Sequence, residues 1–516
     1  MEIDGSRNTP ASGRFFVLAG LLALLPLIFG CATTAGVSIP DFPGRGFPGS
    51  TGPLSVSTAA AENVDDLVTR VLLYVEIANA YHDSGNAAAS AHVIDHAVRL
   101  ITVGGVTDPV VIARVAELFF HLDRIEQGLL HLEKALENAL SISNEWARGE
   151  ALRAVIGAIF VASDAAFEFQ RRAIEAIFVI EDLTTRFGLL IDVSDMYRRT
   201  GATGNANMLL QQAIPAVGAL PDKWRRADAY SRIAQQFQLL GSASSADDYL
   251  RRSLSELRTP DPSPIGDDDR LMVLDISTRF FVLGRQFDAS SVLDATGDRH
   301  LVARGLAAHA ELFGAAGDIP SAYIFLSRAG SAAEQVPDGF LRADAHAEIS
   351  AAYSAIGDVQ LARIHASAAE IAMNGVADQL KIASVFERIA AVIDPADARR
   401  LVAEFSDPTI GARILAGAGI ARLDAEPEGA AELLADAAEA ALESTLSRDA
   451  VLGRIAVALS AAGRFVEAMG LLVEISSPVV QVESLIRIAR DEGFRVEFDQ
   501  AETEIVEAVS AAIRGR

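Results

Sequence analysis

The chain has 516 residues, a formal net charge of −25, and a composition that is 50% hydrophobic but only 6% aromatic. This acidic balance argues against binding of nucleic acid, because basic patches supply most of the affinity for a phosphate backbone, and against lying flat on anionic lipid. An acidic surface of this size either keeps a long protein soluble or steers a basic partner toward it, and composition leaves both interpretations open.

Residues 1–30 have the pattern of a targeting segment. Arg7 and Arg14 precede an apolar run, Phe15–Gly30, which is shorter than the roughly 20 residues needed to span a bilayer and is interrupted by Pro26. The pattern therefore predicts a signal peptide rather than a transmembrane helix.

The apolar run ends at Cys31, the only cysteine in the chain, so disulfides within the chain are excluded. Residues 28–31 (Ile-Phe-Gly-Cys) resemble the bacterial lipobox, in which a signal peptidase cuts before a cysteine that carries lipid. The resemblance implies removal of residues 1–30 and a lipid anchor, a diacylglyceryl thioether on Cys31 with an acylated amino terminus. Ala32 follows the cysteine, which favours the outer membrane over the inner one. An uncleaved anchor and an ordinary secretory signal are the alternatives.

Residues 31–61 are rich in Gly, Pro and Ser and lack helical periodicity, which predicts a flexible tether. Residues 44–49 formally match G-x-G-x-x-G, but a dinucleotide site needs a strand before this motif and a helix after it. Pro43 precedes the motif and Ser50-Thr51-Gly52-Pro53 follows it. We therefore expect no cofactor here.

From residue 62 to the end, apolar and small residues recur at helical spacing and break at regularly placed turn residues. In the clearest unit, Leu341–Asp378, a hydrophobic–small pair and Tyr353 precede the turn at Gly357, and small residues such as Ala362 follow it. The same offsets recur around other turn residues: Gly85, Gly201, Gly241, Gly317, Gly463 and, more loosely, Asp123 and Gly284.

These offsets resemble the tetratricopeptide repeat (TPR) pattern, in which large and small residues of two helices interlock. The resemblance implies an all-α, TPR-like α-solenoid over residues 62–516, with about twelve helical hairpins at a period of about 38–40 residues. We expect the hairpins to stack into an elongated rod. Together with the lipobox, the repeats make the chain similar to bacterial TPR-like lipoproteins.

Residues 379–444 are less regular, with a shortened unit whose turn is Asp394-Pro395. The proline-rich stretch Thr259–Asp269 predicts a longer loop between repeats. Residues 499–513 are expected to form a terminal helix that caps the exposed end of the rod.

Five arginines stand at one fixed offset before a turn glycine, at the start of a first helix, where the helix dipole disfavours a cation. Either they cap backbone carbonyls of the preceding unit or pair with neighbouring carboxylates, or they form a ladder of anion-binding residues along the groove. They are Arg70, Arg186, Arg226, Arg342 and Arg448.

No arrangement typical of an enzyme is found: G-x-S-x-G, H-E-x-x-H and the P-loop are all missing from the sequence. His92 and His96 lie one helical turn apart, as metal ligands often do. However, Ile94 and Ala97 are the expected buried positions of that helix, so both histidines should point to solvent. We expect no metal site and no catalytic residue.

In a stack of such hairpins, one position on each first helix lines the concave groove. These positions are Asn79, Glu117, Asp195, Gln235 and Glu311, followed by Ala351 and Val457, so the groove should be polar to acidic in its N-terminal two-thirds and bland beyond. Their polar and acidic side chains predict a groove that binds another cell-envelope protein through a peptide or exposed helix carrying Lys or Arg. The leading hypothesis is a membrane-anchored, non-catalytic scaffold. The alternative is a small-ligand-binding accessory component paired with a periplasmic solute-binding or transport system, which would need a closed apolar cavity between repeats.

Overall fold

The computed structural model describes residues 52–259, 266–444, 447–493 and 498–515. Two compact units divide the chain at Pro40, and all described residues belong to the second, Asp41–Arg516. The predictions for the signal peptide, for the lipid on Cys31 and for most of the tether lie outside the described residues. None of the helices in the described ranges combines the length and the apolarity needed to cross a bilayer.

In the described ranges the regular structure consists of α-helices and one 3-10 turn, without strands. In chain order the helices are α2 (Pro53–Glu62), α3 (Leu67–Asp83), α4 (Ala87–Gly104), α5 (Pro109–His121), α6 (Ile125–Ser141), α7 (Glu145–Ala162), α8 (Phe167–Phe178), α9 (Leu183–Arg199), α10 (Thr203–Val217), α11 (Lys223–Leu239), α12 (Ala243–Leu257), α13 (Asp267–Val282), α14 (Gln286–Asp294), α15 (Arg299–Ala315), α16 (Ile319–Ala333), α17 (Gly339–Ala355), α18 (Val359–Ala372), α19 (Gln379–Ala390), α20 (Pro395–Ala403), α21 (Pro408–Ile420), α22 (Pro427–Glu443), α23 (Arg448–Ala461), α24 (Phe465–Glu474), α25 (Pro478–Asp491) and α26 (Gln500–Arg514).

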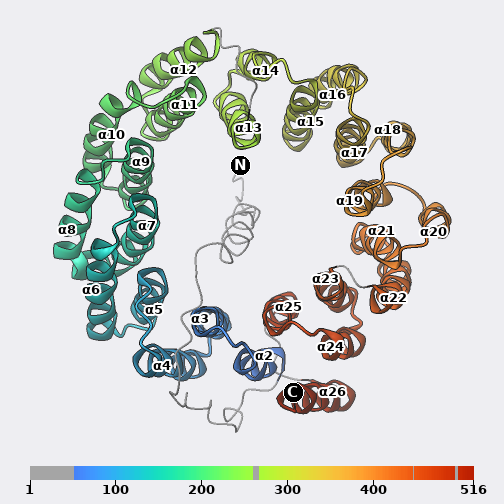
Figure 1. Ribbon diagram of the computed structural model, residues 1–516, viewed down its shortest axis with the longest axis horizontal. Coiled ribbons are helices and arrows are strands. Elements are labelled where there is room, and N and C mark those ends of the chain that lie inside the picture. Colours follow the sequence, from blue (N-terminus) through green and yellow to red (C-terminus); the bar gives the residue numbers. More distant parts are fainter. Residues whose placement is uncertain (1–51, 260–265, 445–446, 494–497, 516) are drawn as a thin grey trace, which may run out of the picture. The chain divides into compact units, whose positions relative to one another are not determined.

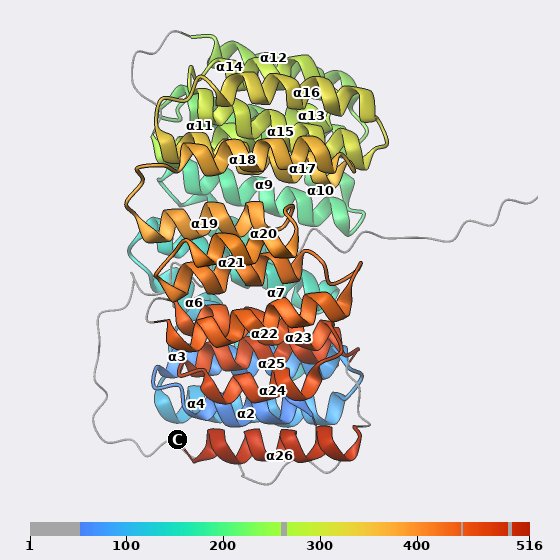
Figure 2. The same ribbon diagram turned by 90° about the vertical axis from the view of Figure 1, so that its right-hand side faces the viewer.

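Consecutive helices from α3 to α24 pair as hairpins, except that α20 does not pack on α19, and each first helix also packs against the first helix of the next hairpin. The first helices, odd-numbered from α3 to α25, form an inner layer, and their even-numbered partners form an outer layer (Figure 1). The side view shows the helices lying roughly parallel, one above another (Figure 2). In the irregular region predicted at 379–444, α20 is short and packs on α21 instead of on α19.

The hairpin turns lie where the sequence places them. Gly357 has φ 86°, and seven other predicted turn residues at equivalent positions also have positive φ, including Asp123 at 57°. Glycine adopts this left-handed conformation without steric cost, which explains its recurrence at the turn. Asp123 shows that the turn tolerates a residue for which this conformation costs more.

Small residues at the helix crossing allow the two helices of a hairpin to approach closely. In α17, Ser350 is buried and its Oγ donates a 2.6 Å hydrogen bond to the carbonyl of Ala362 in α18. Ser194 makes the equivalent bond to Ala206. Tyr353 is 4% exposed and fills the space beside this crossing. The predicted packing of small residues against an aromatic is therefore confirmed.

The repeated arginines cap loop carbonyls. Arg342 Nη1 donates to the carbonyl of Val336, six residues earlier in the loop after α16, at 3.0 Å. Arg70, Arg186 and Arg226 make the same bond over the same spacing, whereas Arg448 lies 3.5 Å from the carboxylate of Glu474. The capping and pairing interpretation is thus confirmed over the anion ladder.

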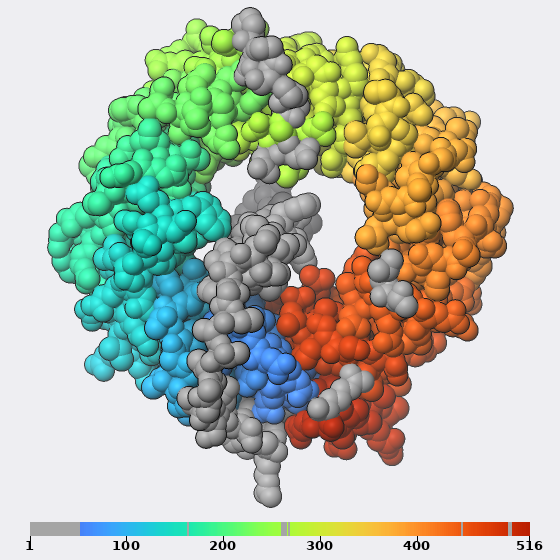
Figure 3. Space-filling view, viewed as in Figure 1, coloured from blue at the N-terminus to red at the C-terminus, as the bar shows by residue number. Residues whose placement is uncertain are grey.

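The two ends of the helical array meet, so the prediction of an open rod is wrong. Helix α2 packs against α25 in the place that a second helix occupies in the other hairpins, and it also contacts α3 and α26. The array is therefore a closed ring of twelve hairpins, the last made by α25 and α2 (Figure 1). The space-filling view shows an opening at its centre (Figure 3).

The assignment of residues 53–61 to a flexible tether is also wrong. Pro53–Glu62 is helical, with Val56 and Ala60 fully buried. Its Ser, Thr and Ala side chains resemble a linker in composition, but they are small enough for close packing on α25. The terminal helix α26 lies against α24 and α2 instead of capping an open end.

Candidate functional site

The predicted groove residues lie at equivalent positions on five inner-layer helices. Asn79, Glu117, Asp195 and Gln235 are half-buried, and Glu311 is exposed. Asp195 on α9 and Gln235 on α11 line one depression, so the structure brings these two together. The other three lie on α3, α5 and α15.

Ion pairs link neighbouring inner helices. Asp192 on α9 accepts from Arg153 on α7 at 2.8 Å and from Arg232 on α11 at 3.2 Å. Farther along, Glu387 on α19 pairs with Arg413 at 2.7 Å and with Arg454 at 2.6 Å. We call these inter-helix pairs the inner charge belt. They hold adjacent repeats in register and leave the inner face with both signs of charge.

A second part of the inner charge belt centres on Asp344 in α17. Its carboxylate accepts from His300 Nε2 at 2.8 Å and pairs with Arg388 on α19. Burial acts to raise the pKa of Asp344, but the hydrogen bond from His300 and the charge of Arg388 outweigh it and hold the pKa well below its usual range. The carboxylate is therefore ionised throughout the physiological range.

Two of the predicted acidic groove residues have arginines beside them. Glu117 pairs with Arg114 at 3.0 Å on the same helix. Asp195 pairs with Arg198 at 2.7 Å and also accepts from Gln236 Nε2 at 3.4 Å. The groove is thus polar, as expected, but its acidic groups at Glu117 and Asp195 are compensated.

Less compensated carboxyls lie where the ring closes. Burial raises the pKa of Glu76 on α3, against the opposing charge of Arg490. Burial also raises the pKa of Glu483 on α25, and the nearby Glu76 adds to this rise. Asn79 lies one helical turn after Glu76 on the same helix. We call Glu76 and Glu483 the seam carboxyls.

The depression that contains Asp195 and Gln235 has a volume of about 440 Å³ and is open to solvent. We call it the inner depression. Side chains from α7, α9, α11 and α13 line it: Arg153, Ile191, Asp192, Asp195, Met196, Arg199, Arg232, Gln235, Gln236, Leu239 and Arg279.

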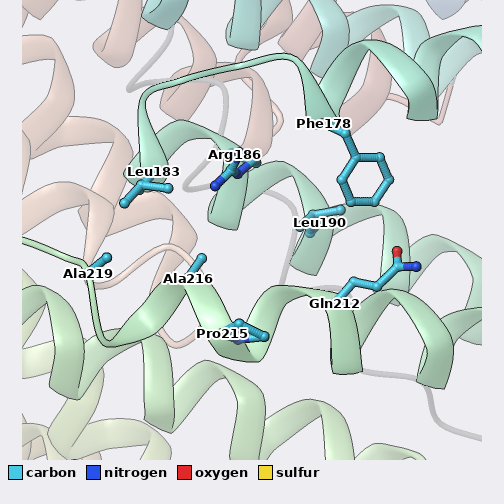
Figure 4. Close-up of a pocket in the computed structure, with 8 residues that line it drawn as sticks. All are labelled: Phe178, Leu183, Arg186, Leu190, Gln212, Pro215, Ala216 and Ala219. Carbon is cyan, nitrogen blue, oxygen red and sulfur yellow. The ribbon is translucent and has the colours of Figure 1, made fainter.

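A second depression, of about 360 Å³, lies between α8, α9 and α10. Phe178, Leu190 and Pro215 supply much of its mostly apolar wall, and Arg186 reaches its edge (Figure 4). That guanidinium donates to the carbonyl of Ile180 at 3.3 Å. Both depressions are open, and neither is the closed apolar cavity that small-ligand binding between repeats would need.

The histidines of α4 do not form a pair. His92 is exposed, but His96 is 1% exposed and packs edge-on against Tyr74 with ring centroids 4.8 Å apart. The expectation that both point to solvent is wrong for His96, because its side chain reaches the first helix of the same hairpin. Within the described ranges, no group of three His, Cys, Asp or Glu side chains is placed to hold a metal ion.

The inner charge belt was not predicted from the sequence. Asp192 and Arg232, like Glu348 and Arg388, are oppositely charged residues 40 positions apart that form an ion pair. Opposite charges one repeat apart are the signal that would have predicted it. The predicted groove residues Asp195 and Gln235 lie one helical turn after Asp192 and Arg232.

No protein-family model matches the chain, and no curated protein matches it. Solved structures with similarity include Ton1535 from Thermococcus onnurineus NA1 (14% identity over 71% of this chain and 98% of that one, TM-score 0.29). The human IFIT1 dimer with PPP-AAAA is also similar, with 13% identity over 81% of this chain and 92% of that one and a TM-score of 0.24. A circular tandem repeat protein with novel repeat topology has 15% identity over 90% of this chain and 95% of that one and a TM-score of 0.17. With TM-scores this low, these structures say nothing about the function of this chain.

The chain's own helices define its class. It is an all-α helical-repeat protein, an α-solenoid of hairpins in which α2, the first described helix, completes the last hairpin. The predicted fold class, with about twelve hairpins, is confirmed.

Proposed function

We propose that this protein is a lipid-anchored, non-catalytic scaffold of the bacterial cell envelope, which holds a segment of another envelope protein against its inner helices. One observation carries the proposal: predicted groove positions on two successive repeats line the inner depression together with charged side chains from four inner helices. A polar, mixed-charge surface of this kind selects a partner through charge complementarity more than through buried apolar area.

The proposed anchor is the acylated Cys31, on the periplasmic or surface face of an outer membrane. About 20 residues separate this cysteine from the start of α2, which sets a limiting reach of about 70 Å between the lipid and the ring. Replacing Cys31 with Ala should release the protein from the membrane fraction. Retention of the Cys31→Ala variant in that fraction would contradict the lipid anchor.

Basic side chains of the partner are proposed to bind near the ring closure. Burial raises the pKa values of both seam carboxyls, and the charge of Glu76 adds to the rise at Glu483, so a Lys or Arg placed beside them would be stabilised as their counterion. Asn79 on α3 and Glu117 on α5 are the predicted groove residues on this side of the ring.

Photo-crosslinking in intact cells tests the scaffold. A benzoylphenylalanine placed at Gln235 should give discrete adducts with one or a few envelope proteins. The matched control is Phe287 on the outer helix α14, which is 91% exposed. The same adducts from both positions, or none from any of the five groove positions, would overturn the proposal.

Charge reversal gives an independent test. Glu117→Lys, close to the seam carboxyl Glu76, should lose the crosslinked partner, whereas Glu133→Lys on the outer helix α6 should keep it. Unchanged capture by both variants, at equal protein yield, would count against binding through the inner face.

The alternative, a small-ligand accessory component, is less well supported. The inner depression has a suitable size for a small molecule, but its polar lining and its opening to solvent favour a peptide side chain over a sequestered ligand. Native mass spectrometry that finds a co-purified metabolite would reverse this preference.

A further inference from the structure

The inner depression has more hydrogen-bond donors than acceptors. Four arginines and two aspartates line it. Asp192 already accepts from Arg153 and Arg232, and Asp195 accepts from Arg198 and Gln236. Each guanidinium carries five N–H groups, and Arg153 and Arg232 each use only one nitrogen to bind Asp192. The site is therefore complementary to an acceptor-rich, anionic group.

Arg199 is the clearest unused donor. It lies at the end of α9, is exposed, and has no ion-pair partner among the residues that the structure describes. Arg279 lines the depression from α13 and uses one terminal nitrogen for both Asp228 and Ser231, at 2.5 and 2.7 Å. Its other nitrogens remain available for a bidentate contact with a carboxylate.

Gln236 gives a second, independent indication of a ligand. It lines the depression, is 7% exposed, and its Oε1 has no hydrogen-bond partner in the described part of the chain. Because a carboxylate only accepts, the contact with Asp195 fixes Nε2 toward that residue and leaves Oε1 as the unpaired atom. A buried amide oxygen without a donor is costly, and a backbone or amide N–H beside the bound carboxylate would satisfy it after a small side-chain rotation.

The apolar part of the lining limits the ligand further. Ile191, Met196 and Leu239 form this part, and Leu239 is 49% exposed. An inorganic anion would leave these side chains uncovered, whereas a carboxylate on a short aliphatic stem would cover them. A glutamate or aspartate residue within a peptide has all three features: an aliphatic stem, a carboxylate and an adjacent amide N–H.

We propose that the inner depression binds an acidic side chain of the partner segment, with Arg199 and Arg279 holding its carboxylate and Gln236 accepting from its amide. This inference rests on the proposed scaffold function and adds a specificity determinant to it. A partner that satisfies both parts of the inner face carries an acidic residue for this site and basic residues for the seam carboxyls.

The test uses the full chain without its signal peptide and saturation-transfer NMR with N-acetylglutamate α-amide as the probe. N-acetylglutamine α-amide, glutarate and inorganic phosphate are the comparison probes. The acidic amide should bind at least tenfold more tightly than its neutral counterpart, because a hydrogen-bonded charge is lost. It should also bind more tightly than glutarate, which lacks the amide, and than phosphate, which lacks the stem.

Matched variants assign the effect to the site. Arg199→Gln, which breaks no ion pair, should weaken binding of the acidic amide about tenfold, whereas Arg114→Gln, an inner-face control outside the depression, should leave it unchanged. Equal binding of the acidic and neutral amides, preference for phosphate or glutarate, or indifference to Arg199→Gln would each overturn the inference. If crosslinking from Gln235 still captures a partner in that case, the scaffold function stands without this site.

Discussion

The side-chain amide of Asn63 donates a 2.9 Å hydrogen bond to the backbone carbonyl of Ile513, 450 residues later in the chain. Asn63 follows α2 directly, and Ile513 lies in α26. This bond joins the first described helix to the last, beside the apolar contact of α2 with α25. Because α2 is the second helix of the twelfth hairpin, closure of the ring depends on contacts between the two ends of the sequence.

A charge introduced into α2 should open the ring. Ala60 is fully buried, and an unpaired carboxylate there should lower the free energy of unfolding by about 3 kcal/mol or more. Urea denaturation of Ala60→Glu measures this, and small-angle scattering should show expansion. Asp65→Ala, at an exposed site just after α2, is the control and should match the wild type. An Ala60→Glu variant with unchanged midpoint and dimensions would show that closure contributes little to stability.

The loop-capping arginines should tolerate glutamine better than an apolar residue. Gln481 occupies the equivalent position in α25, and its Nε2 donates to the carbonyl of Ile475 six residues earlier at 2.8 Å. We therefore expect Arg342→Gln to keep much of the stability and Arg342→Met to lose about 1–2 kcal/mol, since Met leaves the carbonyl of Val336 without this donor. Thermal denaturation of the two variants measures this difference in stability. Equal losses of stability in Arg342→Gln and Arg342→Met would contradict the capping role.

Stability should fall below neutral pH because of buried histidines. Burial lowers the pKa of His96 and of His309 to about 4, whereas both titrate near 6.5 in an unfolded chain. Between these values the unfolded state binds more protons, so the stabilisation is complete above pH 6.5 and decreases as the pH falls toward 4, by about 3 kcal/mol for each histidine. Urea midpoints at pH 7.5, 6, 5 and 4.5 measure this slope.

Replacing a buried histidine should reduce that dependence. His309 is fully buried, so His309→Leu should be less stable at neutral pH but should have a shallower slope between pH 6.5 and 4. The exposed His121→Gln is the matched control and should keep the wild-type slope. Identical slopes in all three proteins would show that burial of these rings does not determine the pH dependence.

Removing the central acid of the inner charge belt should have a small, salt-dependent cost. Asp192→Asn leaves Arg153 and Arg232 without their shared carboxylate, and we expect a loss of about 1 kcal/mol at low salt, since these groups are partly exposed. The loss should shrink in 1 M NaCl because charges are screened. Asp248→Asn breaks an outer pair with Arg251 in which both side chains are more than 60% exposed and should cost almost nothing.

Much of the fold could be predicted because its signals are local. The turn at Gly357 and the crossing of Ser350 with Ala362 depend on residues a few positions apart, and the same pattern recurs along the chain. The groove positions followed from the register of the first helices, and this brought Asp195 and Gln235 to one depression.

The closure of the ring and the set of residues that line the inner depression could not be predicted from local sequence patterns. Helix α2 has only ten residues, and its side chains are largely small, so its own sequence carries a weak signal. Packing against α25 stabilises this helix, and α25 lies more than 400 residues later in the chain. The arginines of the inner depression likewise come from helices of different repeats, so their proximity depends on the stacking itself.

The closing helix also imposes an order on biogenesis. During synthesis α2 leaves the ribosome before the other described helices, yet the surface of α25 that receives it is made only when α25 has been completed. Until then the face of α2 that packs on α25, on a helix whose buried residues include Leu54 and Val56, lacks that partner and is available to chaperones. A chain that stops before α25 cannot bury that face, so the same helix that closes the finished ring leaves apolar surface exposed on an incomplete one.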